Sequence, residues 1–248
     1  MLRFQCVLFF FLILGCTTIE KESARDWILK TNLAHQTALL EETAFRFQFR
    51  EYTYGYSKKK NRKTYSRTRS THEGELTDTL YNDRKFSRWI AGQKIVLSDS
   101  LQKVYSESLN SVLYFMQIPK VLNDRAVEAK IEGETIILGK AYIALKVKFK
   151  QEGGGVDYQD EYRYWIHKEN HLIDYLAYRF YSGDGGTRFR AVSKRERHRG
   201  FVVQDYDNFK PQEKYPLLDK LPLLYEKRKL KQVSKIENEA FTYLTQEK

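Results

Sequence analysis

The stretch FRFQFREYTYGY, residues 45–56, decides the fold class of this chain. Aromatic side chains occupy every second position as far as Phe49, and after a slip at Glu51 the alternation resumes from Tyr52. A period of two is that of a β-strand with one buried face. The single change of parity predicts one long strand with a β-bulge, which would curve the sheet.

Further alternating segments follow this strand at hairpin spacing, separated by polar or glycine-containing turns. They cover residues 63–71, 75–81, 85–90, 94–97, 129–135, 141–151, 158–167, 171–181, 187–192 and 201–205, with a further candidate at 230–236. A meander of about 10–11 antiparallel strands is therefore predicted.

Two segments are predicted to be helical instead. Residues 23–36 carry apolar side chains at intervals of three to five, as in an amphipathic helix. Ser98 or Asp99 can cap a second helix that ends at Pro119 and has a broad apolar face. Such a face must be buried, and the sheet is the large partner available. The expected fold is mainly β: a single curved antiparallel sheet or half-open barrel with helices over its concave face.

The amino end has the three parts of a lipoprotein signal. Arg3 precedes an apolar run over residues 7–14, and Gly15 stands directly before Cys16. The run is shorter than the about 20 residues that span a bilayer. It fits a secretory signal cut before a cysteine that carries acyl chains; the alternative is an ordinary signal peptide followed by an incidental cysteine. We expect a signal peptide at 1–15, lipidation of Cys16 in a tether at 16–22, and one domain at 23–248.

Composition agrees with a place in the bacterial envelope. Cys6 would be lost with the signal and Cys16 acylated, so no thiol would remain for a disulfide, a metal or catalysis. The net charge of +11 favours anionic surfaces such as lipid headgroups or lipopolysaccharide, and nucleic acid is a poor candidate in that compartment. Thr17 is not the aspartate that retains lipoproteins at the inner membrane in some bacteria, so the outer membrane is favoured.

Part of this charge is concentrated in one predicted hairpin. Its cations include Lys58, Lys59, Lys60, Arg62 and Lys63, and no acid interrupts them. The hairpin is either a basic rim that contacts anionic headgroups or a solvated tip without a binding role, which is the commoner case for such a run.

Several short motifs, in chain order, resemble a family of small lipoproteins described as domain of unknown function 6503. They are Leu109-Asn110-Ser111-Val112, Tyr114-Phe115, Leu122-Asn123-Asp124, Gln151-Glu152-Gly153-Gly154-Gly155, Tyr164-Trp165-Ile166, Asp174-Tyr175-Leu176-Ala177-Tyr178, Gly185-Gly186, Arg188-Phe189-Arg190, and Asp205-Tyr206 with Asn208. The resemblance implies an envelope lipoprotein and supplies no reaction.

The expected architecture also resembles the fold of the periplasmic lipoprotein carrier and the outer-membrane lipoprotein receptor, whose concave face receives acyl chains. Fold alone does not establish function. Aromatic side chains on a curved sheet under a helix can line an apolar pocket or can simply fill a core. The candidate lining residues are Phe45, Phe47, Tyr114, Phe115, Trp165, Tyr175 and Tyr178.

Catalytic or metal chemistry is the weaker alternative. His167 and His171 would converge on a metal only on a helix, and here they flank a predicted hairpin turn. Asp174 beside Arg188 or Arg190 is expected to form a buried ion pair that fixes strand register, rather than an acid catalyst. No metal and no cofactor are expected.

The sequence thus favours a non-catalytic, lipid-anchored monomer of the envelope that binds a lipidic ligand or another lipoprotein's acyl chains between sheet and helices. Two alternatives remain at this point. One is a hydrolase of an envelope glycan or ester, with its site between the segments 153–161 and 174–190. The other is a scaffold subunit of an outer-membrane assembly, which would show a flat exposed aromatic patch.

Overall fold

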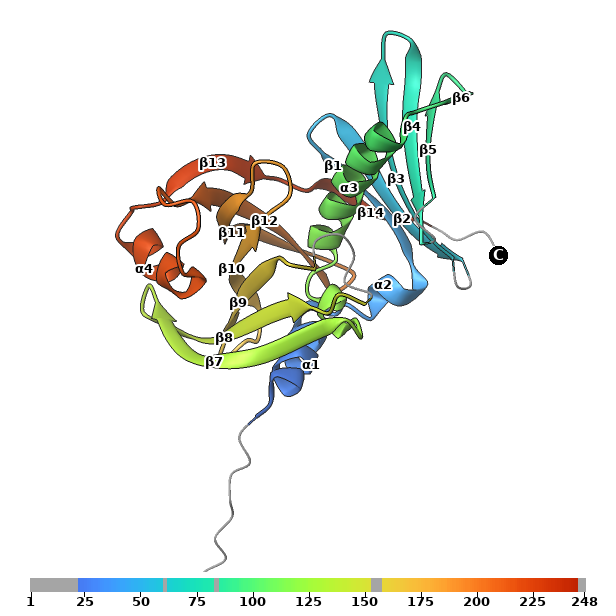
Figure 1. Ribbon diagram of the computed structural model, residues 1–248. Helices are drawn as coiled ribbons and strands as arrows, with labels where there is room; N and C mark the ends of the chain where they lie inside the picture. Colours follow the sequence, from blue (N-terminus) through green and yellow to red (C-terminus); the bar gives the residue numbers. More distant parts are fainter. Residues whose placement is uncertain (1–21, 60–61, 83–84, 153–157, 245–248) are drawn as a thin grey trace, which may run out of the picture.

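The computed structural model describes residues 22–59, 62–82, 85–152 and 158–244 (Figure 1). Cys16, Lys60 and the glycines Gly153–Gly155 lie outside these ranges. In the described part of the chain, fourteen strands form two antiparallel sheets of seven that do not close into a barrel. The mainly β class with covering helices is confirmed. The strands outnumber the predicted 10–11 and divide into two sheets instead of one.

The first sheet has the order β14-β1-β2-β3-β4-β5-β6. Its members are β1 (Ala44–Phe49), β2 (Tyr52–Lys59), β3 (Arg62–Thr71), β4 (Gly74–Tyr81), β5 (Phe86–Ile90), β6 (Gln93–Ile95) and β14 (Glu239–Leu244). All except β14 are consecutive in the chain. β14 was not predicted, and it pairs with β1, so the end of the described chain completes the sheet that its beginning starts.

The second sheet has the order β13-β12-β11-β10-β9-β8-β7. Its members are β7 (Val127–Ile137), β8 (Lys140–Phe149), β9 (Glu161–His167), β10 (Ile173–Phe180), β11 (Gly186–His198), β12 (Phe201–Lys210) and β13 (Lys231–Ile236). The predicted meander is confirmed in order. β11 and β12 extend beyond their predicted ends, and residues 237–238 connect β13 with β14 of the other sheet.

The stretch that decided the fold class is a hairpin, so the predicted bulge within one long strand is wrong. Phe49 pairs directly with Tyr52, and Arg50 takes the turn with φ of 55°. Flanking residues of a two-residue hairpin loop face each other on the same side of the sheet although they are three apart in sequence. A two-residue turn therefore changes the parity of the aromatic pattern as a bulge does.

The helices agree closely with the predicted ones. α1 (Ala24–His35) begins with a capping box in which Ser23 and Asp26 satisfy each other's backbone N–H groups. α3 (Asp99–Met116) begins at the cap Ser98. The shorter helices are α2 (Leu39–Glu42), η1 (Lys120–Asn123), η2 (Leu218–Lys220) and α4 (Leu221–Glu226).

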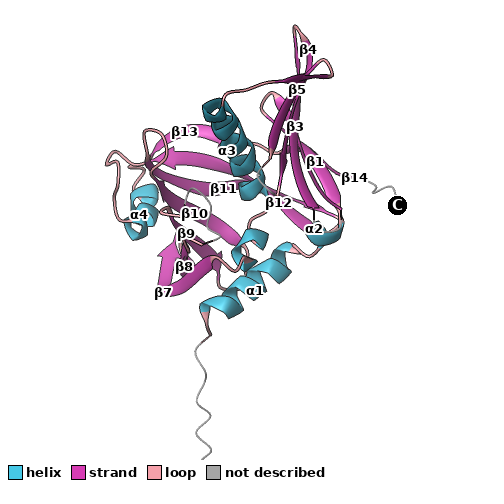
Figure 2. Ribbon diagram, turned by 45° about the vertical axis from the view of Figure 1, so that its right-hand side comes forward, coloured by secondary structure: helices cyan, strands magenta, loops and turns pink. Residues whose placement is uncertain are grey.

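Both faces of the second sheet are covered. Successive side chains on a strand point to opposite sides, so each strand contributes residues to both faces. One face packs Tyr162, Tyr164 and Leu176 against residues of α1 and α3. The other packs Trp165 and Phe189 under η2 and α4. Figures 1 and 2 show α3 between the two sheets, with α4 on the far side of the second sheet. This position of α3 creates the candidate site.

Among the described helices, none is both long and apolar enough to cross a membrane.

Candidate functional site

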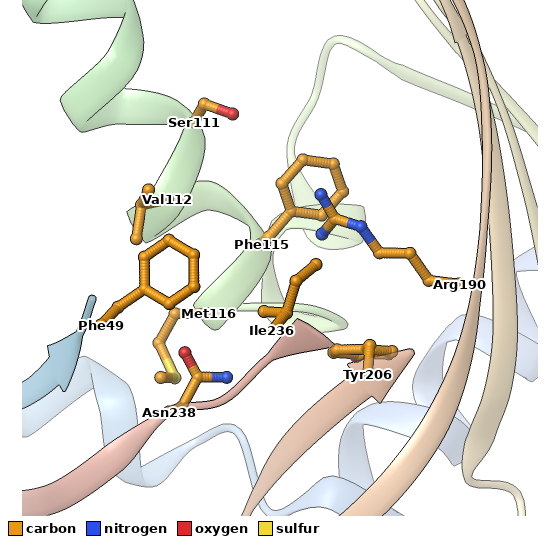
Figure 3. A pocket seen from close by; sticks show the side chains of 9 residues that line it. All are labelled: Phe49, Ser111, Val112, Phe115, Met116, Arg190, Tyr206, Ile236 and Asn238. Atoms are coloured by element: carbon orange, nitrogen blue, oxygen red, sulfur yellow. The ribbon is translucent and has the colours of Figure 1, made fainter. Parts of the chain in front are cut away.

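A cleft opens beside α3, on the side that faces the second sheet (Figure 3); the space between its walls, including the solvent at its open mouth, is about 410 Å³. It is lined by Phe49, Ser111, Val112, Phe115, Met116, Arg190, Tyr206, Ile236 and Asn238. A second, smaller pocket shares Phe115, Met116 and Tyr206 with it and continues along the end of α3 toward Ile118.

One wall of the cleft is a face of the helix α3. Ser111 and Phe115, and likewise Val112 and Met116, are four residues apart, so that they lie on one face of α3. The next residue toward the core, Leu113, is fully buried and holds the helix against the first sheet. The face that lines the cleft therefore continues the core face: Met116 is buried, Val112 and Phe115 are half-buried, and Ser111 is exposed.

The opposite wall is formed by β11, β12 and the connection from β13 to β14. Tyr206 and Ile236 are register partners on β12 and β13. Asn238 is fixed in the connection, because its backbone N–H donates to the Asp205 carboxylate at 2.7 Å and its side-chain amide donates to the Gln204 carbonyl at 2.8 Å. Burial raises the pKa of Asp205. This wall is built from strand pairing and two short hydrogen bonds.

Arg190 reaches into the cleft from β11 and is buried, with 8% of its surface exposed. Its guanidinium carbon lies 3.8 Å from the Phe115 ring centroid, and its Nη2 donates to the Tyr178 hydroxyl at 2.9 Å. Its Nε is buried without a hydrogen-bond partner. No described carboxylate lies within 4.0 Å of this guanidinium. The cleft thus contains one positive charge among apolar and aromatic groups.

Tyrosines form the floor beneath this arginine. Burial raises the pKa of Tyr206 to about 12, and it also raises the pKa values of Tyr114 and Tyr164. All three hydroxyls therefore stay neutral near pH 7, and none is set up as a general base. This floor offers contact area and hydrogen-bonding groups, and it places no negative charge beside Arg190.

The predicted lining residues are distributed over three cores. Phe115 lines the cleft, and Tyr114 and Tyr178 pack beside it, with the Phe115 and Tyr178 rings 5.1 Å apart. Phe45 and Phe47 are buried between the first sheet and α3. Trp165 and Tyr175 lie on the other face of the second sheet, under α4. Strand alternation separates this last pair from Tyr178, which the sequence placed with them.

The basic hairpin lies away from the cleft. Lys58 pairs with Lys63 and Lys59 with Arg62 at the end of β2 and β3, whereas Phe49 of the cleft stands at the opposite end of β1. Lys58 also forms an ion pair with Glu41 at 2.9 Å. These cations cannot form the rim of this cleft, although they can contact another anionic surface.

In the structure, the partner of Asp174 is neither of the two predicted arginines. Asp174 forms an ion pair with Arg195 and accepts a hydrogen bond from the Tyr142 hydroxyl at 2.7 Å. Arg188 stands over the Phe180 ring, and Arg190 faces the cleft. Register shifts after Ile173 and after Val192 change which side chains meet across these strands. Asp174 thus forms an ion pair, but with Arg195 in place of Arg188 or Arg190, and both side chains are only partly buried.

The residues considered for catalysis or metal binding do not converge where the structure describes them. The Nδ1 atom of His167 accepts a hydrogen bond from the Glu169 backbone in a turn, and His171 packs on Trp27. In the described ranges, no group of three His, Cys, Asp or Glu side chains could hold a metal ion.

Sequence reasoning missed most of the lining residues. Ser111, Val112 and Met116 could have been found from the helical spacing with Phe115. Arg190 had a signal too, since it alternates with the fully buried Phe189 and so points to the opposite face of its strand. Phe49 continues the aromatic alternation and Ile236 ends a predicted strand, but no local pattern brings them together with Asn238, because this depends on the long-range pairing of β14 with β1 and of β13 with β12.

A family model described as "Family of unknown function (DUF6503)" matches residues 38–238. No curated protein matches the chain. Among solved structures, a LolA superfamily protein from Nitrosomonas europaea is similar with a TM-score of 0.49 and 14% identity, over 81% of this chain and 97% of that one.

Two further structures are more distant. A putative outer membrane lipoprotein-sorting protein domain from Vibrio parahaemolyticus has a TM-score of 0.34 and 8% identity, over 88% of this chain and 95% of that one. A DUF1329 family protein from Desulfovibrio piger has a TM-score of 0.37 and 13% identity, over 75% and 87%. At these values, the description of the fold rests on the strand pairing of this chain itself.

Proposed function

Because the chain belongs to the family of unknown function DUF6503, which carries no assigned activity, we propose its function from its own cleft. The protein binds an apolar, lipid-like ligand without catalysis, between α3 and the second sheet. The ligand is a membrane lipid, a free acyl chain or the acyl chain of another lipoprotein. The observation that supports this most is the open, largely apolar cleft beside a core that is otherwise closely filled.

The location of the cleft fits an exchangeable ligand better than a defect in packing. Leu109, Leu113 and Tyr164 are fully buried next to it, so the surrounding core is well packed. Interiors at native density leave few voids larger than a water molecule. The cleft is bounded by Phe115 and Ile236 and is open to solvent, so a ligand could enter it and contact these apolar side chains.

The signal sequence supports the cellular context of the proposal. Residues 1–15 would direct the chain into the envelope, and acyl chains on Cys16 would hold it at a membrane, for which we favour the outer membrane. The folded body at 23–248 would then stand close to a source of lipid as a monomer. The basic hairpin would contact anionic headgroups, apart from the cleft.

Native mass spectrometry of the full chain, purified from bacterial membranes in detergent and released from it in the gas phase, tests this proposal. We expect acyl chains covalently bound at the amino end and about one further lipid-like molecule per protein. The Val112→Trp variant should lose that molecule because the new ring fills the cleft. Val104→Trp is the matched control, since Val104 is 57% exposed on the same helix and lies outside the cleft.

Equal retention of lipid by both variants would contradict binding in the cleft. A melting temperature within a few degrees of the parent protein, measured by circular dichroism, shows that each variant is folded.

A further inference from the structure

The buried arginines of this protein are unequal in their partners. Among the arginines that the structure describes, four are less than 10% exposed: Arg67, Arg88, Arg163 and Arg190. The first two share the carboxylate of Asp78, and the third pairs with Glu132. Arg190 alone among the four has no described carboxylate in contact, and it is the one that lines the cleft.

A buried cation without a counter-ion is costly, because several kcal/mol of hydration free energy are lost on burial. The Phe115 ring and the Tyr178 hydroxyl offset part of this cost. The Nε of Arg190 still has no acceptor, and no described residue accepts from its Nη1. The guanidinium therefore has unused donors at the wall of an accessible cleft.

We propose that Arg190 binds the anionic head of the ligand, so that the cleft selects single-chain amphiphiles that end in a carboxylate or a phosphate. This inference rests on the proposed function. The head would lie against Arg190, and the chain would pass over Ile236 along the face of α3 that carries Val112 and Met116 (Figure 3). Planar guanidinium groups suit such oxyanions, because two parallel N–H groups can donate to two oxygens.

The polar groups around the cleft do not oppose an anion. Four acids adjoin lining residues in the chain: Asp205, Asp207, Glu237 and Glu239. The Asp205 carboxylate accepts the backbone N–H of Asn238, the Asp207 carboxylate accepts from the Gln232 side chain, and Glu237 and Glu239 are exposed. Tyr206 is neutral near pH 7 because burial raises its pKa to about 12. The serine hydroxyl at Ser111 and the amide of Asn238 supply further neutral polar groups to the lining.

Photolabelling of the full chain in phosphatidylcholine nanodiscs tests the inference. Three probes carry a diazirine at the same position of a hexadecyl chain and differ in the head: a carboxylic acid, a phosphate monoester and an alcohol. Labelling is read on the tryptic peptide of residues 104–120, which contains the cleft face of α3. Hydrogen bonds to charged groups contribute about 1.5–3 kcal/mol, so both anionic probes should label at least about tenfold more strongly than the alcohol.

Arg190→Gln should reduce labelling by the two anionic probes about tenfold or more and leave labelling by the alcohol unchanged. Arg188→Gln is the matched control: Arg188 lies on the same strand, stands over Phe180 and does not line the cleft. It should change neither. Inorganic phosphate in excess should not displace the anionic probes, because it lacks the chain.

Equal labelling by all three probes, unaffected by Arg190→Gln, would overturn the role of Arg190 and leave the lipid-binding function standing. Displacement by inorganic phosphate would overturn an amphiphile as the ligand. If no probe labels the peptide, the proposed function itself fails. A melting curve of each variant confirms that lost labelling does not come from unfolding.

Discussion

The two sides of α3 hold buried charge in opposite ways. Toward the first sheet, the fully buried Asp78 carboxylate accepts from Arg67 and Arg88 at 2.7–2.8 Å. Toward the second sheet, Arg190 is buried with a phenol and an aromatic ring but without a described carboxylate. The first arrangement is complete by itself, whereas the second leaves donors for something that the chain does not provide.

Polar contacts also hold α3 against the first sheet. Arg67 donates to Ser108 of the helix at 3.0 Å, and the Arg88 guanidinium lies 3.7 Å from the Tyr105 ring centroid. At the far end, Gln117 donates to the Tyr65 hydroxyl of β3 at 3.1 Å. The helix is thus held by polar contacts to the first sheet along its length, and the cleft opens on its other side.

Asp78→Asn should have the largest effect, because it leaves two buried guanidinium groups without a counter-ion. Breaking a buried ion pair in this way typically costs about 3–5 kcal/mol. Urea unfolding followed by circular dichroism measures the loss in free energy of unfolding. A loss below about 1 kcal/mol would show that the Asp78 cluster does not hold this side of the helix.

His35 is a second basic group that is buried beside the second sheet, and it can be compared with Arg190. Its Nε2 accepts the backbone N–H of Ile173 at 3.2 Å. Burial, reinforced by Arg195 and Arg197, lowers the pKa of His35 to about 3. Near pH 6.5 the His35 imidazole therefore binds a proton in the unfolded chain but not in the folded chain. The free energy of unfolding should fall as the pH drops from about 6.5 toward 3.

The slope from this one group is at most about 1.4 kcal/mol per pH unit. Between pH 6.5 and 5, where few carboxylates titrate, His35→Gln should remove this contribution to the slope. The variant should still fold, because the amide oxygen of Gln can accept the backbone N–H of Ile173. Identical slopes for the parent and the variant, from urea unfolding at each pH, would show that His35 is not kept neutral in the fold.

Arg190→Met should contrast with Asp78→Asn. Replacing an unpaired buried cation by an apolar side chain of similar length leaves no charge behind, so the ligand-free protein should be as stable as the parent to within about 1 kcal/mol, or more stable. Urea unfolding of protein extracted free of lipid measures this. A loss of about 3 kcal/mol or more would mean that Arg190 supports the fold as Asp78 does.

Glu41→Gln should have the smallest effect and isolates the role of burial. Like Asp78, Glu41 contacts two cations, Lys58 at 2.9 Å and Lys120 at 3.3 Å, but its side chain is 51% exposed. Exposed pairs contribute about 0–1 kcal/mol and are screened by salt. The expected loss is therefore below about 1 kcal/mol in dilute buffer and absent in 1 M salt. A loss in free energy of unfolding equal to that of Asp78→Asn would show that burial is not what makes the Asp78 ion pairs more stabilising than those of Glu41.

Local patterns sufficed for most elements of this fold. The cap at Ser98 and the apolar spacing from Leu109 to Met116 located α3, and alternation located the strands. The hairpin at Arg50 and Glu51 was misinterpreted because these residues lack the glycine or asparagine that marks most two-residue turns. β14 was missed although Phe241 and Tyr243 alternate in it, because it is short and acquires a partner only through pairing with β1 at the other end of the chain.

The candidate site was predictable only in part for the same reason. Phe115 and Tyr178 could be assigned to a covered face from spacing alone. Whether that face is filled or open depends on how α3, β12 and the connection at Asn238 pack together, which no local pattern records. The partner of Asp174 depended on register shifts in two strands, and these moved Arg195 to it and left Arg190 free to face the cleft.

The most direct measurement is a crystal structure of the protein with hexadecanoic acid that carries bromine on a carbon near its carboxyl end. We predict an anomalous bromine peak in the cleft beside Val112 or Met116 and the carboxylate within hydrogen-bonding distance of Arg190. A cleft that contains only water, or a bromine peak elsewhere with Arg190 unchanged, would contradict it.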